Sequence, residues 1–256
     1  MVHPSDKKSE RQSTVFHSDE HDVLRNRVLL SIPPGELKSL RQQLEPHCFR
    51  QHEILHEPSE RLRFAYFPND GLISLVVSTE DGGTVEVGMV GREGFAGLAG
   101  AVGLRRTLLR QIVQIPGEGY RVKIERLEEL LKASPHFQTA VCRYAVVMGL
   151  HVAQTAACNR LHDAGQRLTR WLLMARDRAD LDALPITHDF LSTILGTDRP
   201  SVSLAAKILQ RSGLIEYKRG RIVILNERKL EAVSCECYRV IRSFSQTIGK
   251  PRDRNW

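Results

Sequence analysis

The stretch ITHDFLSTILGTDRPSVSLAAKILQRSGLIEYKRGRIVIL, residues 186–225, decides the fold of the C-terminal part of the chain. In it, Thr187 can cap a helix that Gly196 ends, because many helices end where a glycine takes a left-handed backbone conformation. Asp198 can then cap a second helix with Pro200 in its first turn, where a missing N–H breaks no hydrogen bond. Two helices joined by so short a turn predict a helix-turn-helix.

The second helix, which can run to Arg211, has an apolar inner face and a small, basic outer face. At 100° per residue, the inner face that packs on the first helix comprises Val202, Ala205, Ala206 and Leu209. The outer face and its flanks comprise Pro200, Ser201, Ser203, Leu204, Lys207 and Arg211. A helical hairpin of another function would have little reason to expose such a strip, so we prefer a helix that reads the DNA major groove.

A short basic hairpin is expected after these two helices. One strand follows Gly213-Leu214-Ile215, the other is Ile222-Val223-Ile224-Leu225, and Gly220 can take a positive φ at the tip. The tip carries Lys218, Arg219 and Arg221, which suit the phosphate oxygens of nucleic acid. Alone this would be a solvated turn, but after two such helices it predicts the wing of a winged helix-turn-helix.

The charge distribution supports a nucleic-acid partner at this end of the chain. The 256 residues carry 37 Lys and Arg against 30 Asp and Glu, a formal net charge of +7. Residues 184–256 hold 13 Lys and Arg against 7 Asp and Glu, so nearly all of the excess lies there. Five scattered cysteines and the lack of an uncharged apolar run of about 20 residues favour a cytoplasmic protein without a membrane partner.

Short strands separated by turns are expected before this part, between Cys48 and Ile124. The expected strands are 64–67, 72–77, 84–90, 111–115 and 120–124. Their regular spacing predicts a small antiparallel barrel or roll. A short helix should begin at Pro34, and residues 1–25, which are polar and rich in charge, should form a mobile tail.

Residues 135–162 predict one long helix with two stripes. The first has the alternating spacing of a coiled-coil seam and comprises Phe137, Val141, Tyr144, Met148, His151, Thr155 and Cys158. The second, of mostly small residues, comprises Ala145, Gly149, Val152 and Ala156. One stripe would meet a partner helix and the other the roll, whereas a monomer would bury both internally. Residues 163–166 are the expected hinge before a helix that contains Trp171.

The chain resembles the Crp/Fnr family of bacterial transcription regulators from about Asn26 to Leu230. The residues that carry the resemblance are Ile186-Thr187, Gly196, Arg199, Val202, Leu209, Gly213-Leu214-Ile215 and Gly220. It implies an α+β fold with an N-terminal antiparallel β-roll of the cyclic-nucleotide-binding type, a dimerisation helix and a winged helix-turn-helix. The expected divisions are tail 1–25, roll 26–133, dimerisation helix 134–163, DNA-binding domain 164–234 and C-terminal tail 235–256.

The resemblance also implies how DNA would be contacted. Arg199 is the candidate for a base contact, since a guanidinium can bind guanine O6 and N7 together. Family members have a glutamate and a second arginine where this chain has Pro200 and Leu204, so a different operator is expected, with Leu204 against a thymine methyl. The expected DNA-contacting set is Thr187, Thr197, Arg199, Ser201, Ser203, Leu204, Lys207, Lys218, Arg219 and Arg221. A homodimer on a near-palindromic operator, in contact with RNA polymerase, is implied.

The sensory pocket departs from the family pattern. Members that bind cyclic nucleotides have a Gly-Glu pair for the ribose and an Arg followed by Ser or Thr for the phosphate. Here Gly97 is followed by Leu98, and the Arg and Ser positions fall on Leu108 and Leu109. Only a shortened loop would bring in Arg106 and Thr107 instead. An apolar wall cannot satisfy a phosphate charge, so we expect an effector other than cyclic AMP.

One segment has the pattern of a zinc hydrolase: His52-Glu53-Ile54-Leu55-His56 reads H-E-x-x-H. That chemistry needs both histidines on one face of a helix, and the segment lies among expected strands with Pro58 close behind. We therefore expect no enzyme here and no metal beyond adventitious binding by His47, Cys48, His52 and His56. A β-roll scaffold that binds other proteins is a further alternative.

The remaining cysteine pattern is Cys235-Glu236-Cys237. A lone C-x-C is more often a pair of unreactive thiols than a metal or redox site. No cysteine precedes Cys48, so the N-terminal iron–sulfur sensor known in the family is not expected either. We therefore expect no cofactor, and a thiol switch at Cys235 and Cys237 stays a minor hypothesis.

Overall fold

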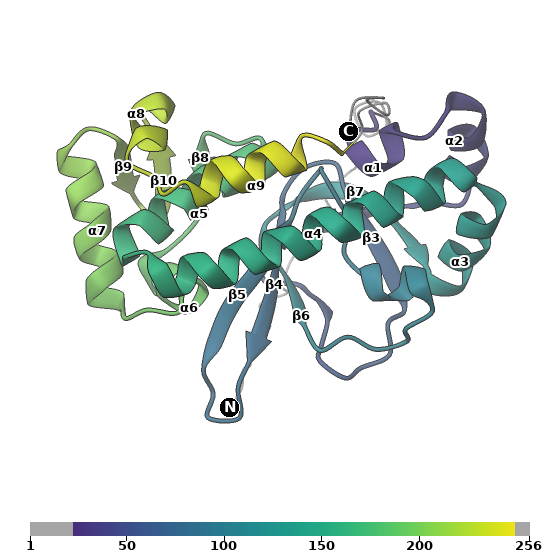
Figure 1. The fold of residues 1–256 in the computed structure, drawn as a ribbon, viewed down its shortest axis with the longest axis horizontal. Helices are drawn as coiled ribbons and strands as arrows, with labels where there is room; N and C mark the ends of the chain where they lie inside the picture. Colours follow the sequence, from purple (N-terminus) through teal and green to yellow (C-terminus); the bar gives the residue numbers. More distant parts are fainter. Residues whose placement is uncertain (1–22, 249–256) are drawn as a thin grey trace, which may run out of the picture.

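The computed structural model describes residues 23–248, and the α+β architecture expected from the sequence is confirmed (Figure 1). A β-roll occupies one end of the molecule and a smaller helical domain the other, and one long helix runs past both. Nearly all of the expected N-terminal tail, residues 1–22, lies outside the described residues, as do residues 249–256.

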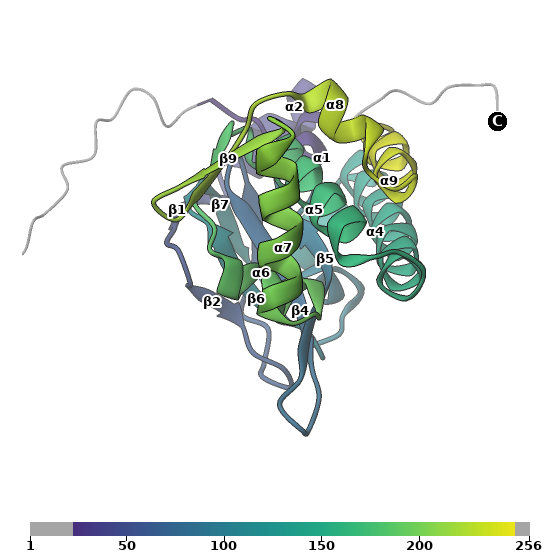
Figure 2. The same cartoon turned by 90° about the vertical axis from the view of Figure 1, so that its left-hand side faces the viewer.

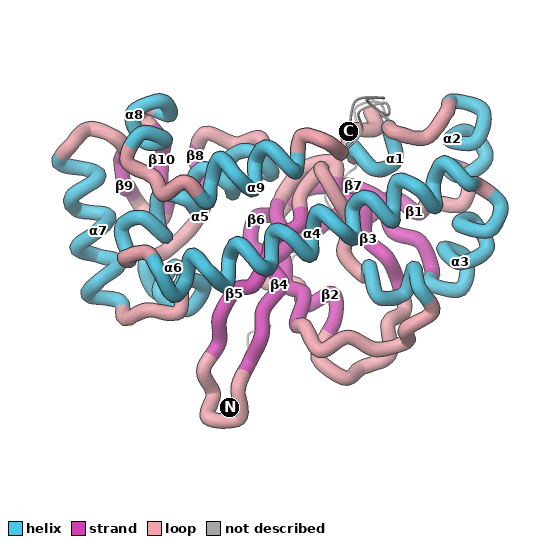
Figure 3. The backbone as a smooth tube through the Cα atoms, viewed as in Figure 1, coloured by secondary structure: helices cyan, strands magenta, loops and turns pink. Residues whose placement is uncertain are grey.

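The roll is built from two antiparallel sheets (Figure 3). One has the strand order β1-β7-β3 and the other β2-β6-β4-β5. The strands are β1 (Glu45–Phe49), β2 (Ile54–His56), β3 (Phe64–Pro68), β4 (Leu72–Ser78), β5 (Thr84–Val90), β6 (Arg110–Ile115) and β7 (Gly117–Lys123). The five strands expected from the sequence all form, and Gly71 takes a φ of 80° in the turn before β4.

Helices close the roll and connect it to the second domain. They are α1 (Arg27–Leu30), α2 (Pro34–Arg41), the 3-10 helix η1 (Leu98–Val102), α3 (Ile124–Ala133) and α4 (Pro135–Leu161). Ser134 caps α4 by accepting a hydrogen bond from the Phe137 N–H at 3.0 Å. Gly94 lets α4 approach the roll, because a Cβ there would lie 2.1 Å from the Tyr144 ring.

The first stripe of α4 faces its own chain. Phe137, Val141, Tyr144, Met148, His151, Thr155 and Cys158 are all buried. In the second stripe, by contrast, Gly149 and Ala156 are exposed and Ala145 and Val152 half-buried. The seam-like spacing of the first stripe therefore serves intramolecular packing. The small-residue stripe is only partly open, because Val152 packs on the roll core.

The second domain follows α4 directly. Its elements are α5 (Ala164–Ala179), β8 (Ala183–Leu184), α6 (His188–Leu195), α7 (Arg199–Arg211), β9 (Ile215–Lys218), β10 (Arg221–Ile224), α8 (Glu227–Ala232) and α9 (Cys237–Ser245). The expected hinge at 163–166 is too long: Asp163 caps α5 in a reciprocal capping box with Gln166, so only His162 and Asp163 separate α4 from α5.

The expected C-terminal tail is wrong for the described residues after Val233. Residues Cys237–Ser245 form α9, which lies beside α4 and α5 (Figures 1 and 2). Tyr238 and Ile241 are buried there, and the Tyr238 hydroxyl donates a hydrogen bond to Asp177 at 2.9 Å. Within residues 23–248, every helix is too short or too polar to span a bilayer.

Candidate nucleic-acid interface

The two helices of the helix-turn-helix, α6 and α7, start and end where the sequence predicts. Thr187 accepts a hydrogen bond from the Phe190 N–H at 3.3 Å, and Gly196 ends α6 with a φ of 57°. Asp198 caps α7 by accepting from the Ser201 N–H at 2.8 Å. A cap of this kind stabilises a helix by about 1 kcal/mol. The residues beside each helix end therefore largely determine where the helix starts and stops.

The outer face of α7 is open to solvent. This helix lies at the outer end of the second domain, away from the roll (Figure 1). Val202, Ala205, Ala206 and Leu209 are buried as expected, and the exposed side chains on the other side include Arg199, Leu204, Lys207 and Arg211. Leu204 is 61% exposed. A solvated leucine of this kind in a basic strip is available for contact with another molecule.

The two serines of the expected set make hydrogen bonds within the protein. The Ser201 hydroxyl donates to the Asp198 carboxylate at 2.7 Å, and Ser203 lies 3.2 Å from the His188 ring. Both are half-buried. Thr187 uses its hydroxyl as a cap, and Thr197 is half-buried in the turn. The hydroxyls of Thr187, Ser201 and Ser203 are therefore already engaged within the protein.

Arg199 has a partner that the local sequence pattern does not reveal. Its Nε donates to Asp189 on α6 at 2.9 Å, and both side chains are about two-thirds exposed. An exposed ion pair is worth about 0–1 kcal/mol, so a guanine or a phosphate can replace the carboxylate at little cost. Asp189 thus holds the guanidinium in the free protein without blocking it.

The hairpin between β9 and β10 has a two-residue tip. Arg219 and Gly220 take φ values of 51° and 75°, the pair of positive angles required by a type I′ turn. Lys218, Arg219 and Arg221 are all exposed there. The sequence predicted the positive φ of Gly220 but not that of Arg219, which is an unusual backbone position for a long side chain.

His188 connects the hairpin to the recognition helix, a role that sequence reasoning missed. Its ring stacks on Tyr217 with a centroid distance of 4.3 Å and contacts Ser203 on α7, the helix expected to enter the major groove and here called the recognition helix. Burial lowers the pKa of His188, so the neutral ring is the form that packs there. The outer face of α7 also includes Ile208, 54% exposed, which the 100° periodicity could have identified beside Leu204 and Lys207.

Some of the expected sensory-pocket residues are engaged in the packing of the roll itself. Gly97 has a φ of 89° and lies against the Phe64 carbonyl, and Leu98 begins η1 and packs on the roll core. Thr107 is buried, and its hydroxyl accepts from the Leu109 N–H at 3.1 Å.

The neighbouring side chains on this loop do not complete a phosphate site either. Arg106 is exposed and Leu108 is 82% exposed. The expected apolar wall is therefore wrong at Leu108, whose side chain points to solvent whereas that of Thr107 is buried.

The H-E-x-x-H segment has no helix. His52 has a φ of 65° in a turn and Ile54–His56 is the strand β2, as the position of Pro58 suggested. Glu53 pairs with His47 at 3.2 Å. Burial lowers the pKa of His56 to about 4. The two histidines of the pattern therefore lie on a turn and a strand, where they cannot form the helical ligand pair of a zinc hydrolase.

Buried charged groups join the roll to α5. Arg178 donates to Glu93 at 3.0 Å with both side chains under 10% exposed, and the Trp171 Nε1 donates to Glu86 at 2.8 Å. Glu86 also pairs with Ser74, and burial raises its pKa to about 7. These contacts form a seam between the roll and α5, and they fix the position of the helix-turn-helix domain relative to the roll.

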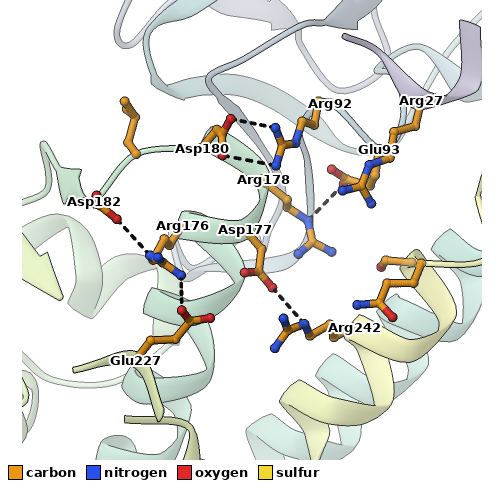
Figure 4. A pocket seen from close by; sticks show the side chains of 13 residues that line it. Arg27, Arg92, Glu93, Arg176, Asp177, Arg178, Asp180, Asp182, Glu227 and Arg242 are labelled. Atoms are coloured by element: carbon orange, nitrogen blue, oxygen red, sulfur yellow. Dashed lines mark hydrogen bonds and ion pairs between the residues drawn. The ribbon is translucent and has the colours of Figure 1, made fainter. Parts of the chain in front are cut away.

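A charged cleft opens beside this seam (Figure 4). In it Arg92 pairs with Asp180 at 2.7 Å, and Arg176 bridges Asp182 and Glu227 at 3.2 and 2.8 Å. Because acids and arginines alternate around the cleft, its charges largely neutralise one another. The cleft is therefore a structural junction rather than an anion pocket.

The cysteines of the C-x-C pattern are not alone. Within residues 23–248, one group of His, Cys, Asp and Glu side chains has three or more ligand atoms converging, and it comprises Cys158, His162, Cys235 and Cys237. The Cys158 and Cys235 sulfurs are 3.6 Å apart, and the hydrogen bond between them lowers the pKa of Cys235 to about 6. The interpretation as an isolated pair is therefore wrong.

Comparison with known proteins places these features in context. Residues 166–233 match the model of the Crp-like helix-turn-helix domain. No curated protein matches the chain in sequence. The matched residues contain α6, α7 and the hairpin, so the interface described above lies inside the matched domain.

Solved structures share most of this architecture. FixK2 of Bradyrhizobium japonicum superposes with a TM-score of 0.64 at 17% identity, covering 75% of this chain and 98% of its own. The c-di-GMP-responsive global regulator CLP of Xanthomonas campestris gives 0.62 at 16% identity, covering 76% and 100%. A CRP-family regulator of Thermus thermophilus gives 0.59 at 20% identity, covering 73% and 95%. The chain therefore has the fold of these proteins.

Proposed function

We propose that the chain is a DNA-binding regulator of the Crp/Fnr type, which controls transcription as a homodimer bound to a near-palindromic operator. The observation that carries the proposal is the open face of α7, where Arg199, Leu204 and Lys207 lie exposed beside the basic hairpin. A helix inserted in the major groove needs such a strip, and cations of the wing suit the flanking phosphates.

The exposed side of α4 supports the dimer. Val146 and Leu150 are 64% and 42% exposed, and Cys142, Gly149 and Ala153 continue the same side of the helix. Positions 142, 146, 149 and 153 alternate in spacing between four and three, the repeat that two helices share in a coiled coil. A second copy packed on this side would cover the exposed apolar groups.

The dimer makes a geometric demand on the operator. Two α7 helices related by a two-fold axis would enter successive major grooves about 34 Å apart, which requires two inverted half-sites. Family members have charged residues where this chain has Pro200 and Leu204, so we expect half-sites of a different sequence. Mapping of bound promoters in cells would then separate activation through RNA polymerase from repression.

The signal that controls binding would be an effector other than cyclic AMP. Leu98 supplies no carboxylate for a ribose, and Arg106 is exposed whereas Thr107 is buried. Calorimetric titration of the full chain with cyclic AMP should give no heat of binding at micromolar concentrations. A micromolar dissociation constant would contradict this part of the proposal.

Selection from random duplexes tests the function directly. The full chain should enrich an inverted repeat, and its affinity should fall steeply with salt because bound cations displace counterions from phosphates. The Arg199→Ala variant should enrich a repeat that is relaxed at one base position of each half-site, whereas Arg239→Ala, which removes an exposed cation on α9, should enrich the unaltered repeat. Enrichment of no common sequence would overturn the proposal and favour the protein-binding scaffold.

A further inference from the structure

Four ligand-type side chains meet where α4 ends and α9 begins. Cys158 and His162 lie one turn apart at the end of α4, and Cys235 and Cys237 flank the start of α9. Their ligand atoms all lie within 4.8 Å of one another. The three thiols are under 5% exposed and form a small cluster of their own, separate from the two hydrophobic cores.

The spacing of these atoms matches a tetrahedral metal site. Zinc–sulfur bonds of about 2.3 Å and zinc–nitrogen bonds of about 2.0 Å place neighbouring ligand atoms of a tetrahedron about 3.5–3.8 Å apart. Cys158 and Cys235 sulfurs are 3.6 Å apart, and Cys237 Sγ lies 3.6 Å from His162 Nδ1. The two pairs thus have the separations of opposite edges of the tetrahedron before any ion is bound.

Neighbouring groups complete the surroundings expected of metal ligands. The other ring nitrogen of His162, Nε2, lies 3.4 Å from the Glu236 carboxylate, which fixes the ring with Nδ1 toward the thiols. The Gln154 amide donates to Cys237 Sγ at 3.1 Å. Metal-bound histidines commonly carry such a carboxylate on the second nitrogen, and donors to sulfur stabilise the thiolate.

We propose that Cys158, His162, Cys235 and Cys237 bind one structural zinc ion. Four protein ligands leave no open position for water or substrate, which is the property that separates structural from catalytic zinc sites. Soft thiolates with one imidazole favour zinc over magnesium or calcium, which prefer oxygen. Binding would release the thiol protons and leave three thiolates near the buried cation Arg170.

The ion would fasten α9 to the junction of α4 and α5. Cys158 lies on α4 and His162 in the short link before α5, whereas Cys235 and Cys237 follow the whole helix-turn-helix domain. The ion therefore closes a loop that contains that domain. Its loss should loosen α9 and leave the recognition helix intact, so the site can be tested without reference to DNA binding.

Metal content of the unaltered protein gives the first test. The full chain, purified without a histidine tag, should contain about one zinc ion per chain when measured by inductively coupled plasma mass spectrometry. The Cys237→Ser and His162→Ala variants should lose most of it, and Cys142→Ser, which removes an exposed cysteine on α4, should retain it. Circular dichroism establishes which variants are folded. If the variants do not fold, the zinc content of the unaltered protein is the result that tests the proposal.

Cobalt substitution and hydrogen exchange give the second test. Cobalt in place of zinc should produce the thiolate charge-transfer and tetrahedral bands of a three-sulfur site. Removal of the metal should raise amide exchange in α9 at least several-fold more than in α7. Iron with acid-labile sulfide, a Cys158–Cys235 disulfide, or five titratable thiols with no bound metal would each overturn the proposal.

Discussion

Charged side chains serve opposite purposes at the two faces of the helix-turn-helix domain. On the face of α7, Arg199 and Lys207 are exposed, and the carboxylate that pairs with Arg199 is exposed too. In the seam against the roll, Arg178 and Glu93 are buried and paired. Exposed charges can be changed without loss of the fold and so report binding, whereas buried charges hold the domain in place and report stability.

The largest effect is expected in the seam. Arg178→Met leaves Glu93 buried without its counter-ion and should reduce the free energy of unfolding by about 3–5 kcal/mol. Urea titration of the full chain measures the loss. The double variant Arg178→Met with Glu93→Leu removes both charges and should recover a large part of it, whereas a single-variant loss under about 1 kcal/mol would mean that the pair is solvated.

Glu86 should make stability depend on pH in the same seam. Its pKa in the folded protein, about 7, lies above the ordinary 4.5, so the fold favours the protonated form. This contribution is present in full below about pH 4.5 and is lost as pH rises through about 7. The uncharged Glu86→Gln variant keeps an acceptor for the Trp171 N–H and offers an amide N–H to the Ser74 hydroxyl, which donates to the carboxylate in the unaltered protein.

The expected result is a difference between two stability curves. Relative to Glu86→Gln, the unaltered protein should lose up to about 3 kcal/mol of unfolding free energy between pH 4.5 and about 8. Urea unfolding at several pH values measures it, and the comparison cancels other titrating groups. Parallel curves for the two proteins would show that Glu86 does not titrate in this range.

An intermediate effect is expected on the exposed face. Arg199→Ala should weaken operator binding by about 1–3 kcal/mol and relax one base position in each half-site. Fluorescence anisotropy on the selected operator and its single-base variants measures both effects, with Arg239→Ala as the control. An equal loss of affinity on every operator variant would assign Arg199 to phosphate contact instead.

The contrast between the two faces explains how far the sequence could predict the structure. Helix ends, the positive φ of Gly220 and the outer face of α7 depend on neighbouring residues, so they follow from local patterns. The seam depends on residues such as Trp171 and Glu86, which are 85 positions apart. Nothing in their local patterns indicates that they meet.

The cysteine cluster was missed for the same reason, although a signal was present. Cys158 and His162 are four residues apart on one helix, and Cys235 and Cys237 form a C-x-C pattern. Separately each pattern is common, and 77 residues separate Cys158 from Cys235. Only the packing of α9 on α4, where a tail was expected, brings the two pairs together.

The smallest effect is expected at the wing. Arg219 holds a positive φ that glycine adopts without strain, so Arg219→Gly should change the unfolding free energy by less than about 1 kcal/mol. If the side chain contacts a phosphate, the slope of log affinity against log salt should fall by about 1 per protomer, uniformly across operator sequences. Lys218→Ala, at an ordinary backbone position, is the matched control for charge. A changed sequence preference in Arg219→Gly would show that the wing reads bases, and the division between a reading helix and a positioning wing would then be wrong.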